Sequence, residues 1–279
     1  MALSPIIDQT RPDQTRPDQT RPDHYSAFYS DKFYKGHHSD LSITSARKIV
    51  SVLKQYINFE SVIDIGCGVG QNLMACYESG AKIIRGVDGS WVNKDLLMLP
   101  KECFTQYDLS QPNIKAAIPE QHFDLTISSE VAEHIDKKDT DTYMDNLTSF
   151  SDVILFSAAI PGQGGTHHVN EQWPSYWIEK FAARGYVPVD CIRFKLWYDK
   201  EVQLWYRQNL MIFVKENALD EYPELKREAE KPVIDVVHFG IWDNVHRATK
   251  RGFKANCRMI LSGLSDIIPS FFRAVKNRI

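Results

Sequence analysis

The stretch Val62–Gly70, V-I-D-I-G-C-G-V-G, decides the fold that we expect for this chain. It starts as a short apolar run and ends in glycines at positions 66, 68 and 70, with Asp64 two residues before the first glycine. Glycines permit a sharp turn and let a ligand approach the backbone, because no Cβ stands in the way. A helix that follows such a turn points its N-terminus at the ligand. The stretch therefore predicts a buried strand, a turn and a helix around a ligand site.

Short apolar runs alternate with helical patterns over residues 42–214. Such alternation is typical of a parallel sheet that is covered by helices on both faces. The expected strands are Val62–Ile65, Ile83–Val87, Cys103–Tyr107, Phe123–Ser128, Val153–Ser157, Val187–Arg193 and Leu210–Val214. The expected helices are Ser42–Tyr56, Asn72–Ser79 and Pro174–Arg184. We therefore expect an α/β fold with a Rossmann-like, doubly wound sheet.

The chain divides by composition into three parts. The pentapeptide Asp-Gln-Thr-Arg-Pro occurs three times between Asp8 and Pro22. A proline-containing repeat without apolar residues predicts a disordered tail over residues 1–23, which is either a docking arm or a dispensable repeat. Residues 24–217 carry the strand and helix pattern of one domain, and residues 218–279 predict a helical, basic extension.

The composition is that of a soluble globular protein, with 279 residues, 43% hydrophobic and 25% charged. The net charge of -3 gives no overall attraction to nucleic acid, so a nucleic-acid partner is not expected. The five cysteines form no C-x-x-C pair, which argues against a disulfide framework or structural zinc and favours a reducing compartment. With no recognisable signal peptide or membrane span, we expect a cytoplasmic protein. The sequence leaves the oligomeric state open.

Two features distinguish the glycine-rich loop from the loop of dinucleotide-binding enzymes. Its spacing is G-x-G-x-G rather than G-x-G-x-x-G, and the carboxylate of Asp64 precedes it. S-adenosylmethionine (SAM) carries an ammonium and a sulfonium group where a dinucleotide carries a pyrophosphate, so an acid beside the loop suits SAM. A dinucleotide-binding oxidoreductase is the alternative from another class of protein.

Two further acids follow the next two expected strands. Asp88, in G-V-D-G-S, can accept hydrogen bonds from both ribose hydroxyls, and Asp108, in Q-Y-D-L, can accept one from the adenine amino group. Helix capping explains any one of these acids, but three at consecutive strand ends favour a SAM site. The expected cofactor-binding residues are Asp64, Gly66, Cys67, Gly68, Gly70, Asp88, Gly89, Asp108, Leu109 and Glu130.

The order of these motifs resembles the class I SAM-dependent methyltransferases. The resemblance covers Ser39 to Glu216 and includes F-D-L-T-I-S-S-E-V-A-E-H around the fourth expected strand. The phrases G-V-D-G-S-W-V, S-A-A-I-P-G-Q-G-G-T and H-V-N-E-Q-W-P-S-Y-W resemble a bacterial group of such enzymes. The resemblance implies a seven-stranded sheet with the last strand antiparallel and SAM across its carboxyl edge. Asp64 and the glycine loop would hold the methionine end of SAM, Asp88 the ribose and Asp108 the adenine.

A possible metal site follows the fourth expected strand. If this segment is helical, Glu130, Glu133 and His134 share one face, and His168 could complete a set of ligands for Mg²⁺ or Mn²⁺. Similar E-x-x-E-H clusters occur in metal-dependent methyltransferases of small-RNA 3′ ends and of the ubiquinone pathway. Such a metal would bind vicinal hydroxyls and acidify the one that is methylated. The alternative is that Glu133 and His134 only shape the pocket.

The same histidines are the candidate catalytic residues. His168 lies after a glycine-rich stretch that suits a mobile lid, and we expect it and His134 to act as ligands or as general base. Aromatic residues favour a sugar or glycan hydroxyl as acceptor, although most of them are expected in the core. These are Trp173, Tyr176, Trp177, Trp197, Tyr198, Trp205 and Tyr206. A non-sugar small molecule, an RNA 3′ end, or SAM binding without catalysis are the alternatives.

The C-terminal segment has a charge of its own. From Val245 to Ile279, eight lysines and arginines stand against one acid, Asp266. Apolar residues recur among them at near-helical spacing, which fits a helix packed on the domain, a peripheral membrane contact or a nucleic-acid contact. Packing is the first of these interpretations and membrane contact the second.

Overall fold

The computed structural model describes residues 40–233 and 235–246. The predicted N-terminal tail over residues 1–23 and the basic segment from residue 247 onward lie outside the described residues. No helix in the described ranges is long and apolar enough to cross a membrane.

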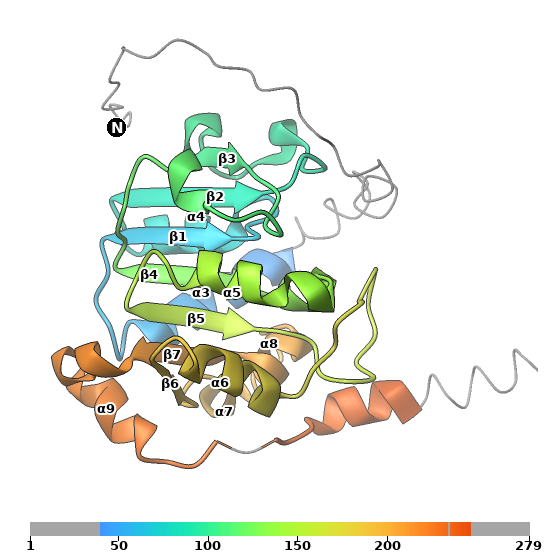
Figure 1. Ribbon diagram of the computed structural model, residues 1–279. Helices are drawn as coiled ribbons and strands as arrows, with labels where there is room; N and C mark the ends of the chain where they lie inside the picture. The colour runs from blue at the N-terminus through green and yellow to red at the C-terminus, as the bar shows by residue number, and fades with distance from the viewer. Residues whose placement is uncertain (1–39, 234, 247–279) are drawn as a thin grey trace, which may run out of the picture.

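A seven-stranded sheet forms the centre of the protein, with the strand order β3-β2-β1-β4-β5-β7-β6 (Figure 1). Its strands are β1 (Ser61–Ile65), β2 (Ile83–Asp88), β3 (Phe104–Gln106), β4 (Leu125–Ser129), β5 (Val153–Ser157), β6 (Tyr186–Val189) and β7 (Met211–Lys215). The last strand, β7, runs antiparallel to β5 and β6, and the other pairs are parallel. The strand order reverses between β1 and β4, where folds of this kind bind ligands at the carboxyl edge. The predicted α/β fold with a Rossmann-like, doubly wound sheet is confirmed.

Helices cover both faces of the sheet. The helices α3 (Asp40–Leu53), α4 (Gln71–Glu78) and α9 (Pro223–Ala229) pack into one apolar core, and α5 (Thr140–Leu147) and α6 (Pro174–Ala182) pack into the other. Neighbouring strand residues alternate between the two cores, so Val62 joins the first and Ile63 the second. Two further helices, α7 (Arg193–Leu196) and α8 (Leu204–Asn209), precede β7. Single 3₁₀ turns are η1 (Lys94–Leu96), η2 (Lys101–Cys103), η3 (Ile114–Ala117), η4 (Ala132–His134), η5 (Lys137–Asp139) and η6 (Glu216–Glu221).

The predicted strand Val187–Arg193 is wrong at its carboxyl end. The strand β6 stops at Val189, and Arg193 begins α7. The Arg193 guanidinium is fully buried and pairs with Asp190 at 2.7 Å, and a buried charge of this kind requires its partner in place. The other predicted elements agree with the structure to within about three residues at either end.

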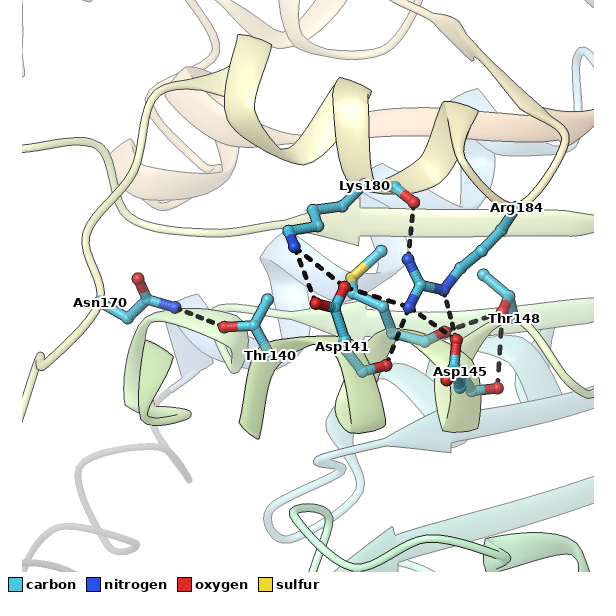
Figure 2. Close-up of polar contacts among 8 residues, drawn as sticks. Thr140, Asp141, Asp145, Thr148, Asn170, Lys180 and Arg184 are labelled. Carbon is cyan, nitrogen blue, oxygen red and sulfur yellow. Dashed lines mark hydrogen bonds and ion pairs between the residues drawn. The ribbon is translucent and has the colours of Figure 1, made fainter. Parts of the chain in front are cut away.

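A group of charged side chains joins α5 to α6, as Figure 2 shows. Arg184 donates hydrogen bonds to Asp145 Oδ1 at 2.7 Å and to the Asp141 carbonyl at 3.0 Å, and Lys180 donates to Asp141 at 2.9 Å. At the other end of the seam, the buried amide of Asn170 donates to Thr140 Oγ1 at 3.2 Å. The segment that precedes α6 is therefore held against α5 by the hydrogen bond of Asn170.

We expect Arg184→Ala to lower the free energy of unfolding by about 1 kcal/mol, because its carboxylate partners are exposed and screened by solvent. Chemical denaturation measures this change. The matched control is Lys82→Ala, whose partner Glu60 is equally exposed but whose own side chain is not packed between helices, and no measurable change is expected there. A loss above about 3 kcal/mol in Arg184→Ala would mean that the contact behaves as a buried pair, contrary to our expectation.

Candidate active site

The glycine loop after β1 has the geometry that its residues predict. Gly66, Gly68 and Gly70 have φ angles of 87°, 54° and 91°, in the left-handed region that favours glycine. A Cβ at Gly66 would lie 2.4 Å from Val131 Cγ2, and one at Gly70 would lie 2.0 Å from Leu99 Cδ2. Both the backbone conformation and the space around it therefore require glycine.

Asp88, at the end of β2, connects the glycine loop to the turn that follows β2. Its Oδ2 accepts a hydrogen bond from the Gly68 amide at 2.7 Å, and its Oδ1 accepts one from the Gly89 amide at 2.6 Å. The Trp91 side chain also donates to this carboxylate, and its ring lies so close to Gly89 that a Cβ there would be 2.2 Å away. Burial raises the pKa of Asp88, and the two amides offset part of this rise. The carboxylate is therefore held at the edge where the ribose of SAM is expected.

Asp64 is buried beside the loop and is poorly satisfied. Its Oδ1 has no hydrogen-bond partner among the described residues, and its Oδ2 accepts only a long bond, 3.4 Å, from Asn72. Burial raises the pKa of Asp64 to about 7, and the charge of Asp88 adds to the rise. A buried carboxylate with an unused oxygen is suited to an ammonium donor. This environment fits the predicted contact with the methionine end of SAM.

Three further predicted cofactor residues lie close to this edge of the sheet. Asp108 accepts hydrogen bonds from the amide and hydroxyl of Ser110, at 3.0 and 2.7 Å, so it orders its own turn as a cap does. Leu109 is buried in the core. Cys67 is buried as well, and burial raises the pKa of its thiol well above the ordinary value, so it packs as a neutral side chain.

Hydrogen-bonded polar side chains lead from Asp64 through Asn72 to Ser129, at the carboxyl end of β4. The Asn72 amide also donates to Ser129 Oγ at 3.0 Å, and the hydroxyl of the half-buried Tyr206, on α8, hydrogen-bonds to Ser129. The sequence did not indicate Asn72 or Ser129 as site residues, and it pointed to Tyr206 only as one of the aromatic residues of the acceptor side. Of the predicted aromatic residues, Trp177 lies in the core and Tyr198 on the surface, so they do not form one binding face.

Glu130 follows β4 in a conformation that differs from the helical segment considered for it. Its φ angle is 56°, and the short helix η4 begins only at Ala132. Its carboxylate accepts hydrogen bonds from Asn209 at 3.0 Å and from Gln163 at 3.1 Å. Glu130 therefore does not share a helical face with the residues that follow, and its oxygens are held by amide side chains.

The structure does bring Glu133, His134 and His168 together. One ligand atom of each lies within 4.8 Å of the others, and Glu130 lies outside this group. The rings of the two histidines are in edge contact, with centroids 4.9 Å apart. Two backbone bonds cause this meeting, because the amides of Val169 and Asn170 both donate to the Glu133 carbonyl, at 2.9 and 3.0 Å.

Oxygen atoms outside the group orient both rings. His134 Nδ1 lies 3.2 Å from the His167 carbonyl, and His168 Nδ1 lies 2.8 Å from Glu171 Oε1. A neutral imidazole that donates from Nδ1 carries its lone pair on Nε2, as a metal ligand or a general base must. Burial lowers the pKa of His134 to about 4, with the charge of His168 adding to the effect, so His134 is neutral at pH 7.

Glu133 is the least compensated group of the site. It is fully buried, and neither carboxylate oxygen has a hydrogen-bond partner of normal geometry among the described residues, although the Glu130 carboxyl and two backbone amides lie close to it. Burial raises the pKa of Glu133 well above the ordinary value and the charge of Glu130 raises it further, while the nearby amides of Glu133 and Ala159 oppose the rise only in part. An ionised carboxylate in such a place is costly without a cation, so a cation there would compensate it.

Glu171 organises the glycine-rich loop, which sequence reasoning did not anticipate. Its carboxylate accepts hydrogen bonds from the amides of Gly162 and Gly164, at 2.7 and 2.8 Å, and also holds His168. The glycine-rich loop that we expected to be a mobile lid is thus linked internally by hydrogen bonds to the Glu171 carboxylate. Its signal in the sequence is a carboxylate three residues after His168 in a glycine-rich segment.

Comparison with known proteins agrees with this fold. An O-methyltransferase family protein from Burkholderia thailandensis matches with a TM-score of 0.50 and 12% identity, over 69% of this chain and 62% of that chain. The methyltransferase domain of the bacterial protein CtHen1 matches with a TM-score of 0.46 and 19% identity, over 63% of this chain and 98% of its own. At such identities the likeness concerns the fold alone. No curated protein matches the chain significantly.

A family model gives the more specific result. Residues 37–182, which are 146 of the 279 residues, match the model described as a methyltransferase domain. The matched range begins before α3, contains β1 to β5 and ends with α6, so it includes the glycine loop, Asp88 and the Glu133 group. Together with the sheet order and its antiparallel last strand, this match shows that the chain belongs to the methyltransferase-domain family, of the class I, SAM-dependent type.

Proposed function

We propose that this protein transfers the methyl group of SAM to a hydroxyl of a sugar, a glycan or another hydroxylated acceptor, and that a divalent cation bound by Glu133, His134 and His168 assists. The observation that carries this proposal is the buried group of one unpartnered carboxylate and two oriented imidazoles. It stands beside the expected cofactor loop, because Gly66 packs directly against Val131, two residues before Glu133.

The cofactor would bind along the carboxyl edge from β1 to β3. Asp64 would accept hydrogen bonds from the ammonium group of SAM, and Asp88 from its ribose hydroxyls. Asp108 and Leu109 would border the adenine. The chain thereby aligns the sulfonium methyl with the acceptor, and alignment supplies a large share of the rate of a direct displacement.

The acceptor side must remove a proton from the attacking hydroxyl. His168 suits this role because Glu171 holds its Nδ1 and leaves Nε2 as the basic nitrogen. His134 is neutral at pH 7 and adjoins it, so either imidazole can hold the proton or a ligand. A bound divalent cation would orient vicinal hydroxyls and lower the pKa of the one that is methylated.

The donor set bears on which ion would bind. With Glu130 held by Asn209 and Gln163, the group offers two imidazoles and one carboxylate. Magnesium prefers an all-oxygen environment, whereas imidazole ligands suit first-row transition ions. We therefore favour Mn²⁺ over Mg²⁺. The competing interpretation, in which Glu133 and His134 only shape the pocket, predicts no dependence on metal.

The deciding experiment combines binding and turnover. Calorimetry with SAM and with NAD(P) should show binding of SAM only, and methyl transfer to a panel of sugars and other polyols should stop with EDTA and return with Mn²⁺. Activity that EDTA leaves unchanged would exclude the metal while keeping the methyltransferase. Binding of SAM without transfer to any hydroxylated acceptor would instead favour a non-catalytic SAM-binding module.

We expect Glu171→Gln to weaken Mn²⁺ binding by about tenfold, because a neutral amide orients His168 less firmly than a carboxylate does. Paramagnetic resonance of free Mn²⁺ measures this affinity without reference to activity. Glu179→Gln, an exposed acid on α6, is the matched control and should bind Mn²⁺ as the wild type does. Equal affinity in Glu171→Gln would show that Glu171 organises the loop without supporting a metal ligand.

A further inference from the structure

An aromatic patch lies on the surface formed by α7, the residues after it and the helix over residues 239–246. We define it by Phe194, Trp197, Tyr198, Phe239 and Trp242. Its members include the four most exposed large apolar side chains that the structure describes, at 77% for Tyr198, 63% for Trp242, 59% for Phe239 and 47% for Phe194. Tyr198 stacks on Phe239, and Phe194 on Trp197, with ring centroids 6.3 and 5.3 Å apart. Clustered exposure of this kind marks an interaction surface.

The framework under the patch is ordered. His238 is buried, its Nε2 lies 2.7 Å from the Trp197 carbonyl, and its amide donates to Gln208 Oε1 at 2.5 Å. Ile241 is buried on the inner side of the helix over residues 239–246, so Phe239 and Trp242, three residues apart, share its outer side. The segment that carries Phe239 and Trp242 is therefore packed on the domain through its other side chains, and these two rings face away from the domain.

The chain continues from this helix into a strongly basic segment. Residues 247–279 contain eight lysines and arginines and one acid, Asp266, a net charge of +7. The same residues include Ile260, Leu261, Leu264, Ile267, Ile268, Phe271 and Phe272. Aromatic and aliphatic side chains together with an excess of positive charge are the composition of segments that lie at the surface of anionic membranes.

We propose that the aromatic patch binds the surface of an anionic phospholipid membrane. Charge complementarity supports this occupant, because the +7 segment begins five residues after Trp242. Nucleic acid would account for the charge, but it gives no role to the aliphatic residues of the segment. The patch is also connected to the site, since α8 contributes Gln208 to the framework of the patch and Asn209 to Glu130. In Figure 1, the helix over residues 239–246 lies on the side of the molecule toward which β1 and β5 point.

The test is co-sedimentation of the full chain with phospholipid vesicles, which requires neither SAM nor an acceptor and so succeeds or fails independently of the proposed activity. We expect binding to phosphatidylcholine vesicles that contain about one third phosphatidylglycerol, and release by salt of about 0.5 M. The double variant Phe239→Ser/Trp242→Ser should bind at least about tenfold more weakly, because it removes two apolar anchors.

A matched control separates the patch from general surface hydrophobicity. Tyr77→Ser/Ile83→Ser removes two exposed apolar side chains at 38% and 46% exposure, on α4 and β2 and not among the patch residues, and should bind vesicles as the wild type does. Both double variants should retain the wild-type unfolding transition. Equal binding to neutral and anionic vesicles, undiminished binding of Phe239→Ser/Trp242→Ser, or preferential binding of single-stranded RNA would overturn the proposal.

Discussion

Glu133→Gln is expected to reduce methyl transfer at least about 100-fold and to leave SAM affinity unchanged, because it removes the central charge of the acceptor site and spares the cofactor loop. The same substitution should raise the free energy of unfolding of the metal-free protein by about 1–3 kcal/mol, since it removes a buried carboxylate that has no hydrogen-bond partner among the described residues. If Glu133 is needed for activity but lowers the stability of the fold, function and not folding explains why a glutamate occupies this position.

Three measurements test this expectation together: the rate of methyl transfer, calorimetry with SAM, and denaturation in the presence of EDTA. Glu102→Gln, which removes an exposed carboxylate near β3, is the control and should change none of them. If Glu133→Gln lost activity and stability in parallel, Glu133 would be a structural residue. If activity stayed within about threefold, Glu133 would have no part in the proton or metal chemistry.

Asp64→Asn is expected to weaken SAM binding by about 10- to 100-fold, because an amide replaces the charged acceptor of the ammonium group. The pH dependence follows from the raised pKa of Asp64, about 7 in the folded protein. Below that pH the side chain is protonated and cannot pair with the ammonium group, so wild-type affinity should rise as the pH increases through 7. In Asp64→Asn this rise should disappear.

Calorimetry with SAM at several pH values measures both effects, and Asp95→Asn provides a control at an exposed carboxylate that pairs with Lys101. A wild-type SAM affinity that did not change between about pH 6 and about pH 8 would contradict the role of Asp64. Below the pKa of Asp64, each pH unit should cost about 1.4 kcal/mol of binding free energy.

The stability of the SAM-free protein should depend on pH in the opposite direction. The raised pKa means that the folded, SAM-free protein binds more protons, so this residue contributes less to stability as the pH rises from the ordinary aspartate range to about 7.

The predicted strands and the cofactor side of the site rest on local signals. In β5, each residue of Val153–Ser157 is buried, and a continuous apolar run shows this directly. Gly66 and Gly70 take left-handed conformations that other residues avoid, so their spacing encodes the turn. Asp64 and Asp88 come together because parallel neighbouring strands end at the same edge, and their register pairs Asp64 with Gly86.

The acceptor side depends on contacts that have no local signal. Asn209 reaches Glu130 across 79 residues of sequence, and Gln163 reaches the same carboxylate across 33. Helical spacing placed Glu130 with Glu133 and His134, but its φ angle of 56° interrupts the helix, so periodicity was misleading there. His168 meets Glu133 only because two amides of its loop bond to the Glu133 carbonyl.

Val62–Gly70 and the alternation around it thus determined the fold, the carboxyl-edge site and its acids, since backbone conformation and burial along a strand follow from residues close in sequence. The antiparallel direction of β7 came from family resemblance and not from any pattern in its residues, and its place between β5 and β6 came from the structure. Only the tertiary structure decided which side chains surround the acceptor. Burial without a partner, as at Glu133, and orientation by a distant oxygen, as at His134, are properties of the packed chain, because each depends on atoms that the sequence does not place side by side.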